Sequence, residues 1–168
     1  SLCYMPLEKG FAEVSGMTNF SFEYPRFKGI DAYHNLYEGL GKACKLAIKV
    51  IKKAMKKADY VYIHLNETDF PGHDNKPLEK EYMIEYIDAT LIRFLRKIAP
   101  SKKINVVVTG NYSAPCKAKN HTADPVPVLF YNQGEIPRER KFSEKECRLG
   151  QLGRSVGPEL LKKVGFVK

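Results

Sequence analysis

The stretch YVYIHLNETDFPGHDNKP, residues 60–77, runs from a β-prone segment through a polar break to the start of a helix, and the fold is organised around it. Its first part, Tyr60–Leu65, is rich in aromatic and β-branched residues, which favours a buried strand. Pro77 suits the first turn of a helix, where its missing N–H is no loss. Apolar residues from Met83 to Ile98 recur at helical spacing, and we expect this helix to stop at Pro100.

Two further β-prone runs follow this helix. INVVVT at Ile104–Thr109 and VPVLFY at Val126–Tyr131 have the length and composition of buried strands. The pattern from Asp31 to Lys57 is helical, whereas residues 1–30 mix short apolar pieces with Pro and Gly and indicate strands and turns. This order predicts an α/β fold, and the βαβ unit from Tyr60 to Val108 predicts a mainly parallel sheet flanked by helices.

The composition is that of one globular domain, and we assign residues 1–168 to it. No apolar run approaches the roughly 20 residues that cross a bilayer, and Ser1 does not open a signal-peptide pattern. We therefore expect a cytoplasmic protein that does not contact membranes. The cysteines stand far apart without a CxxC pair, which favours reduced thiols over disulfides or a structural zinc site, with Cys44 in the core. They are Cys3, Cys44, Cys116 and Cys147.

The net charge of +9 raises the question of an anionic ligand such as nucleic acid. Much of this charge falls on one predicted helix, where lysines recur opposite apolar positions, as expected for the solvated face of an amphipathic helix. No aromatic residues interleave with them as in a surface that stacks bases, so nucleic acid is not the favoured partner. These lysines are Lys42, Lys45, Lys49, Lys52, Lys53, Lys56 and Lys57.

Polar side chains follow the predicted strands at the edge where open parallel sheets bind ligands. We expect Asp69, His73, Asn111 and His121 to converge there. Asp69, His73 and His121 would supply one carboxylate and two imidazoles, a ligand set that suits manganese, zinc or iron. The local Asp-x-x-x-His spacing fits a capped turn with a surface histidine equally well, so the residues alone leave both interpretations open.

Four segments resemble one enzyme family, the cofactor-independent phosphoglycerate mutases of the archaeal type. DFPGHDNKPLEKEYMIEYID resembles the family's Asp-x-x-Gly-His segment, and NHTADPVPVLFY resembles its His-Ser/Thr-x-(Asp/Asn)-Pro-Val-Pro motif. FSEKECRLGQLGRSVGPELL resembles the family's closing Gly-x-Leu-Gly-Arg segment, and YMPLEKGFAEVSGM resembles a stretch ahead of its helical region. The resemblance therefore extends over nearly the whole chain.

This resemblance implies membership of the alkaline phosphatase superfamily, with a central sheet flanked by helices. It implies two adjacent metals, usually manganese, and a serine that carries the phosphoryl group between 3-phosphoglycerate and 2-phosphoglycerate in glycolysis. The chain corresponds to the C-terminal portion of such an enzyme, so we expect its sheet to be incomplete without an N-terminal segment. Residues 1–30 would include the return from an inserted domain. By motif, Asp69, His73 and His121 match the ligands of the first metal, and Lys9 matches a lysine that contacts substrate.

Two departures from the family change the expected chemistry. Where the family has Thr-Gly-Asp-His-Ser-Thr-Pro for its second metal, residues 109–115 read TGNYSAP. Asn111 and Tyr112 are poor substitutes for a carboxylate and an imidazole, so we expect one metal rather than two. The nucleophilic serine lies in an N-terminal segment of the family, and Ser113 does not align with it. The resemblance thus gives this chain no catalytic residue of its own.

The sequence therefore predicts the metal-binding C-terminal part of a phosphoglycerate mutase, inactive or weak in isolation. Such a part would act on a phosphorylated small molecule only with an N-terminal partner chain, or would form a homo-oligomer that covers its exposed sheet edges. The alternative is an inactive mutase-like module that binds or regulates. A one-metal phosphohydrolase, in which a metal-bound hydroxide replaces the serine, is the third interpretation.

Overall fold

The computed structural model describes residues 1–3, 6–26, 31–134 and 141–167. Residues 4–5, at the start of the stretch YMPLEKGFAEVSGM, and residues 27–30 lie outside the described residues. The strands and turns expected at these positions therefore stay predictions. The described chain forms two compact units, each treated separately below. The first unit is Ser1–Phe94 with Ala114–Asn120, and the second is Leu95–Ser113 with His121–Lys168.

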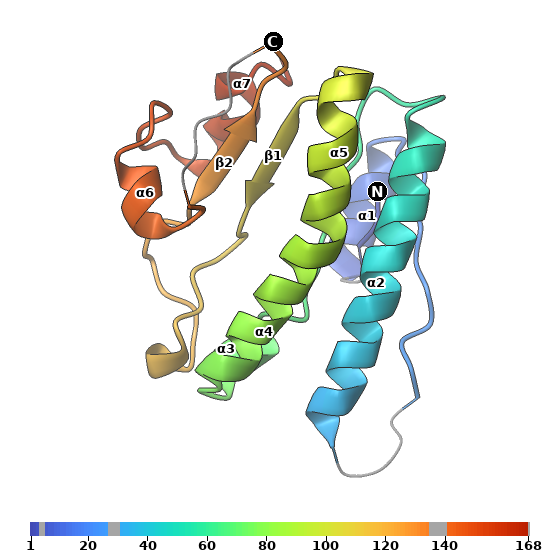
Figure 1. Cartoon of the computed structure of the whole chain (residues 1–168). Helices are drawn as coiled ribbons and strands as arrows, with labels where there is room; N and C mark the ends of the chain where they lie inside the picture. Colours follow the sequence, from blue (N-terminus) through green and yellow to red (C-terminus); the bar gives the residue numbers. More distant parts are fainter. Residues whose placement is uncertain (4–5, 27–30, 135–140, 168) are drawn as a thin grey trace. The chain divides into compact units, whose positions relative to one another are not determined.

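The helices and strands are labelled in Figure 1. In the first unit they are α1 (Pro6–Val14), α2 (Ala32–Ala54), α3 (Phe70–His73), α4 (Pro77–Ile87), a π-helical turn (Asp88–Ile92) and a 3-10 turn (Cys116–Ala118). Helix α5 (Arg93–Lys102) continues α4 and leads into the second unit, which holds β1 (Val106–Thr109), β2 (Val128–Tyr131), α6 (Glu144–Arg148), a 3-10 turn (Gly157–Glu159) and α7 (Leu160–Lys163). No helix of the described residues is both long and apolar enough to cross a bilayer.

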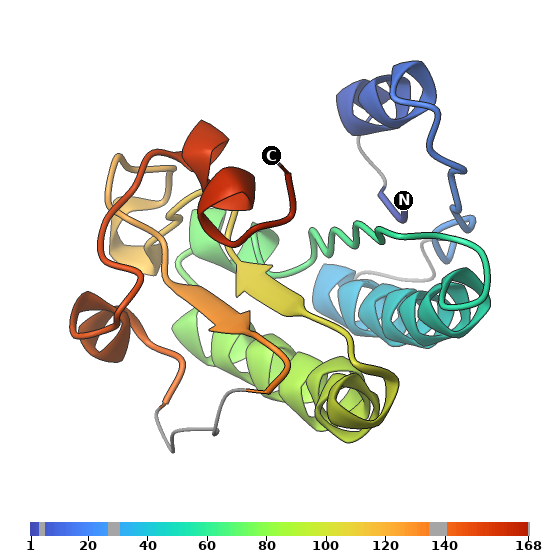
Figure 2. The same cartoon turned by 90° about the horizontal axis from the view of Figure 1, so that it is seen from above.

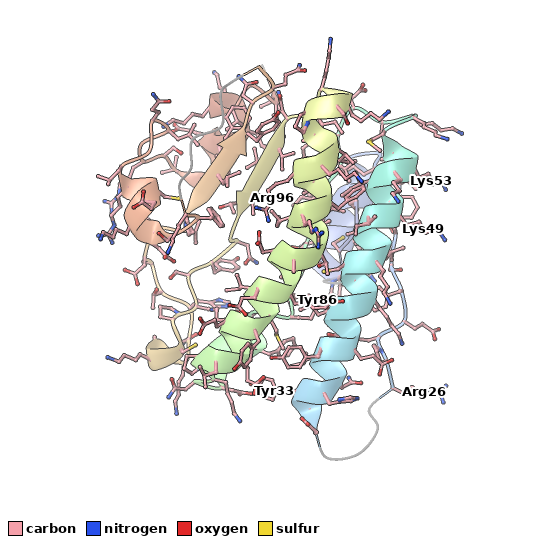
Figure 3. All side chains as sticks on the ribbon, viewed as in Figure 1. Arg26, Tyr33, Lys49, Lys53, Tyr86 and Arg96 are labelled. Carbon is pink, nitrogen blue, oxygen red and sulfur yellow. The ribbon has the colours of Figure 1, made fainter. Side chains whose placement is uncertain are left out.

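Helix α2 confirms the helix predicted between residues 31 and 57. Asp31 begins it, because its carboxylate accepts hydrogen bonds from the backbone N–H groups of Tyr33 and His34 at 3.0 and 3.1 Å. One face is buried and packs against α4 and the π-helical turn. Tyr86 points from α4 toward this face (Figure 3), and its hydroxyl would lie 3.3 Å from a Cβ placed at Gly41. The lack of a side chain at Gly41 therefore makes room for Tyr86.

The basic side of α2 is in part occupied by intramolecular contacts. Lys49 and Lys53 project from successive turns (Figure 3), and the ammonium of Lys53 lies 5.3 Å from the ring centre of Phe20. The ammonium of Lys52 lies 5.4 Å from the ring centre of Phe94. Such contacts attract a cation to the face of an aromatic ring. The lysines of this side are nevertheless exposed, which agrees with the prediction of a solvated amphipathic face.

The sequence pattern predicted that the helix beginning at Pro77 stops at Pro100, and this prediction is wrong. Helices α4 and α5, joined by the π-helical turn, continue to Lys102, with Pro100 inside the last turn. Proline costs most in a helix interior, where it removes a hydrogen bond and clashes with the preceding turn. Pro100 is exposed and only two residues from the helix end, which is closed by Lys103 at φ 54° and a bond from Ile104 N–H to Ala99 O at 3.0 Å.

Strands β1 and β2 confirm the cores of the predicted strands 104–109 and 126–131. They pair antiparallel, with Val106 opposite Tyr131 and Thr109 opposite Val128, and they lie side by side in Figures 1 and 2. The ladder among the described residues is therefore antiparallel, and the predicted mainly parallel sheet is not confirmed. A chain that turns back through a loop alone pairs antiparallel, whereas a parallel neighbour requires a crossover connection.

The predicted strand Tyr60–Leu65 is extended but pairs only at one residue. Ile63 forms a parallel bridge with the buried Leu2, through bonds from Leu2 N–H to Tyr62 O and from His64 N–H to Leu2 O, at 2.8 and 2.9 Å. Leu2 is thus the bridge partner given to this run among the described residues, and the predicted βαβ pairing stays a prediction. Helix α1 also corrects the expectation of only strands and turns in residues 1–30.

The four thiols differ in burial, so we expect them to differ in how fast they react with a thiol reagent. Cys3 and Cys44 are each 1% exposed, and burial raises the pKa of the Cys44 thiol, whereas Cys116 and Cys147 are partly exposed. Because the thiolate is the reactive form, Cys116 and Cys147 should react first with Ellman's reagent in the native protein. Two fast and two slow equivalents are expected, and all four should react in denaturant. Four fast equivalents in the native state would contradict the buried positions.

Candidate metal centre

Asp69 and His73 lie at the two ends of the short helix α3, directly after the extended run 60–65. A turn closed by Asp69 N–H and Asn66 O at 3.1 Å precedes the helix, and Pro71 occupies its first turn. The spacing of four residues brings both side chains to one side of the turn, with His73 Nε2 3.4 Å from Asp69 Oδ2. The structure thus brings these two predicted ligands together within the first unit.

The hydrogen bond on the far side of the His73 ring indicates which nitrogen is available. Nδ1 lies 3.2 Å from the carbonyl oxygen of Lys119, an acceptor only, so Nδ1 donates its proton there. In the neutral imidazole, which is the form that ligates a metal, the lone pair is then on Nε2, beside the Asp69 carboxylate. A histidine that ligates a metal commonly donates its other ring N–H to a backbone carbonyl in this way. Both side chains are partly exposed, His73 by 39% and Asp69 by 34%.

The separation of these two atoms fits a small divalent cation. Ligand bonds of about 2.0–2.1 Å in tetrahedral geometry place neighbouring ligand atoms about 3.3 Å apart. The observed 3.4 Å between Asp69 Oδ2 and His73 Nε2 matches this value. The separation of these two atoms is thus compatible with a shared metal ion.

The segment 114–119 braces this loop from one side. The ammonium of Lys80 donates to Ala114 O at 2.7 Å, and the Cys116 thiol contacts Pro71 O at 3.6 Å. Gly72 allows the close approach, since a Cβ there would lie 2.8 Å from Ala114 O. The segment that carries the Lys119 carbonyl is thus held against α3 by contacts at Ala114 and Cys116.

The start of α2 holds the loop from a second direction. The Tyr33 hydroxyl donates to Asp74 Oδ2, and the Tyr37 hydroxyl donates to Glu79 Oε2, both at 2.7 Å. Burial and the neighbouring carboxylates raise the pKa of Tyr33 well above its usual range and that of Tyr37 to about 12. Both phenols therefore remain protonated donors at neutral pH. The sequence pattern did not predict a role for these tyrosines, because nothing in it links them to carboxylates some forty positions away.

The remaining predicted ligand, His121, lies in the second unit. Its ring stacks on that of Tyr112, with centroids 4.7 Å apart and an interplanar angle of 9°. A bridge between Ser113 and Thr122, closed by a bond from Thr122 N–H to Ser113 O at 2.8 Å, fixes the backbone next to both rings. His121 and Tyr112 are therefore brought together, as two exposed side chains.

Asn111 and Tyr112, the positions predicted to have lost the second metal, offer little to a cation. The amide oxygen of Asn111 accepts from the N–H of Tyr112 at 3.0 Å and is thus engaged locally. The Tyr112 ring stacks on the His121 ring, and the residue is 62% exposed. Neither residue supplies a carboxylate or an imidazole.

Lys9, the predicted substrate-binding residue, lies on α1 and is half-buried. Its carbonyl accepts from the Asn19 amide at 3.1 Å. The preceding residue, Glu8, pairs with His64 Nδ1 at 2.6 Å and attaches α1 to the extended run 60–65. His64 is therefore a structural residue with a hydrogen-bond partner, and the role of Lys9 stays a prediction.

The chain is similar to known proteins over most of its length. The chain is 37% identical over 156 residues to 2,3-bisphosphoglycerate-independent phosphoglycerate mutase of Thermococcus gammatolerans, and 35% identical over 156 residues to that of Pyrococcus abyssi. Each alignment covers 92% of this chain, which spans 35% of the length of each mutase. The solved structure of PH0037 protein from Pyrococcus horikoshii superposes with a TM-score of 0.73 at 28% identity, covering 96% of this chain and 47% of that one.

A family model described as Metalloenzyme superfamily matches residues 36–168. Together with the superposed structure, this match supports an alkaline-phosphatase-like metalloenzyme fold, here with helices and a small sheet. The resemblance to archaeal phosphoglycerate mutases noted in the sequence is confirmed by the relatives, for part of their length. The chain belongs to the Metalloenzyme superfamily.

Proposed function

We propose that this chain binds one divalent metal ion through Asp69, His73 and His121. The observation that carries the proposal is the arrangement at His73, whose Nδ1 is held by Lys119 O while Nε2 lies 3.4 Å from Asp69 Oδ2. Only two peptide bonds separate His121 from Lys119, so covalent geometry limits the two Cα atoms to about 7.6 Å. One carboxylate and two imidazoles make a suitable set for a divalent cation.

We further propose that the bound metal serves phosphoryl transfer, as in the phosphoglycerate mutases that this chain resembles. The ion would supply a Lewis acid for the phosphoryl oxygens. Asp69 would offset part of its charge, and the Lys119 carbonyl would keep His73 in the ligating tautomer. Manganese is the metal we favour, with zinc or iron as alternatives, and the interconversion of 3- and 2-phosphoglycerate in the glycolysis of the cytoplasm is the reaction.

The proposed activity requires residues beyond those that this chain offers. The chain spans about a third of each mutase relative, and the resemblance assigns the nucleophilic serine to an earlier segment of the family. An N-terminal partner chain or another part of the same protein would supply that serine and extend the sheet with parallel strands, whereas a second copy of this chain would only cover exposed sheet edges. The chain alone is expected to be inactive or weak toward phosphorylated small molecules.

A second candidate function is a metal-binding module without catalysis. It is favoured by Asn111 and Tyr112, since the amide of the first is engaged by backbone and the ring of the second lies on His121. A second metal would then have no strong ligands at these positions. Both candidates share the first metal and differ only in whether turnover follows from it.

The measurement that tests the metal site shared by both candidates is the metal content of the chain after loading with manganese or zinc and dialysis. About one ion per chain is expected, with no turnover of 3-phosphoglycerate by the chain alone. Elemental analysis measures the first quantity, and a coupled enolase assay measures the second. A content near zero would overturn both candidates, and metal-dependent turnover would exclude the module without catalysis.

A further inference from the structure

We propose that Tyr112 is a positioning residue that sets the orientation of the His121 ring before a metal binds. The inference rests on the proposed function, because it concerns one of the three proposed ligands. The ring centroids are 4.7 Å apart and the planes differ by 9°, which is an offset stack of two aromatic rings.

The exposure of Tyr112 argues that its ring serves this stack rather than the core. Tyr112 is 62% exposed, so most of its surface remains in contact with water. An exposed tyrosine of this kind adds little hydrophobic stabilisation, which depends on the apolar area removed from water. The stack on His121 is the ring contact that the described structure gives it.

Hydrogen bonds fix the backbone at Tyr112 and next to His121, so that the stack has only side-chain torsions left to restrict. Asn111 Oδ1 accepts from Tyr112 N–H at 3.0 Å, and Ser113 and Thr122 form a bridge. Tyr112 and His121 each directly precede one partner of this bridge. The Thr122 hydroxyl further donates to Asp124 Oδ2 at 2.7 Å. The two ring-bearing residues therefore start from a braced backbone, and the stack restricts the side-chain torsions that remain.

Stacking leaves the chemistry of the imidazole available. The contact uses the face of the His121 ring, whereas both nitrogens lie at its edge and keep their lone pair or proton. An exposed histidine normally loses side-chain freedom when it ligates a metal, and this loss weakens binding. Because Tyr112 has already restricted the ring, less freedom is lost on binding. Removing the ring should therefore weaken metal binding by about 3- to 10-fold.

The test compares Tyr112→Ala and Tyr112→Phe with the wild-type chain and with Tyr82→Ala, which removes a similarly exposed tyrosine on α4. In the metal-free chain, the His121 ring protons should show an upfield NMR shift from the tyrosine ring current. The shift should persist in Tyr112→Phe, which keeps the ring without the hydroxyl, and disappear in Tyr112→Ala. Tyr82→Ala should leave it unchanged.

Calorimetric titration with manganese or zinc gives the second readout. Wild type, Tyr112→Phe and Tyr82→Ala should share one Kd, and Tyr112→Ala should bind about 3- to 10-fold more weakly. Equal affinity of Tyr112→Ala and wild type, or a metal-free wild type without the ring-current shift, would overturn the positioning role alone. A wild-type chain that shows the shift but binds no metal would overturn the proposed function and, with it, the positioning role.

Discussion

His73→Ala is expected to weaken manganese or zinc binding more than about 100-fold. Loss of a group that only hydrogen-bonds to a metal ligand already costs about 10- to 100-fold in metal affinity, and loss of the ligand itself should cost more. The substitution removes the Nε2 ligand beside Asp69 and the bond that Lys119 O makes to Nδ1. The histidine is 39% exposed, so its loss removes little packing from the core. The metal-free variant should lose only about 1 kcal/mol of stability, the usual value of one hydrogen bond.

The matched control for this variant is His34→Ala. His34 is exposed on the first turn of α2, and only its backbone N–H takes part in the cap that Asp31 makes. Its replacement removes the same side chain at a position without a proposed metal role. Titration calorimetry should give an unchanged Kd for His34→Ala. Binding by His73→Ala within about threefold of wild type would mean that this histidine is not a ligand.

Gly72→Ala is expected to destabilise the first unit by about 1–3 kcal/mol, the usual cost of overpacking. The added Cβ would lie 2.8 Å from Ala114 O and 3.2 Å from the ammonium of Lys80. The oxygen belongs to the backbone and cannot rotate away, so α3 and the segment 114–119 must separate. Because Lys119 orients His73, we also expect weaker metal binding in this variant.

Gly10→Ala gives the control for Gly72→Ala. A Cβ at Gly10 meets no atom within 4 Å, and the residue is inside α1, where alanine is favoured over glycine by roughly 0.5–1 kcal/mol. Urea denaturation should therefore show the two substitutions moving the unfolding midpoint in opposite directions. Equal midpoints would show that the contact between Gly72 and Ala114 does not constrain the loop.

The local elements of the fold could be predicted from the sequence, and the pairing of its strands could not. The helical period across 31–57 and from Pro77 depends on neighbours within a few residues, and α2 and α4 follow it. Strand direction depends on which distant segment supplies the partner. The run 60–65 has a strand composition, yet its described partner is Leu2, which no periodicity could indicate.

The site divides in the same way. Asp69 and His73 are four residues apart, so a single helical turn brings them together and the sequence could predict it. The bond from His73 to Lys119 and the bond from Tyr33 to Asp74 span 46 and 41 residues. Such bonds arise from tertiary packing alone. The stack of Tyr112 on His121 was not predicted, because the sequence motif showed only that Tyr112 replaces a histidine ligand of the second metal.

The bonds of Tyr33 and Tyr37 to Asp74 and Glu79 have a thermodynamic consequence. Moving the loop that carries Asp69 and His73, together with the start of α4, away from α2 breaks these bonds. We therefore expect local opening of the loop and of the first turns of α2 to be coupled. Coupling of this kind is reciprocal. An ion bound at the loop would therefore stabilise the beginning of α2, and residues that never approach the ion help to set how tightly it is held.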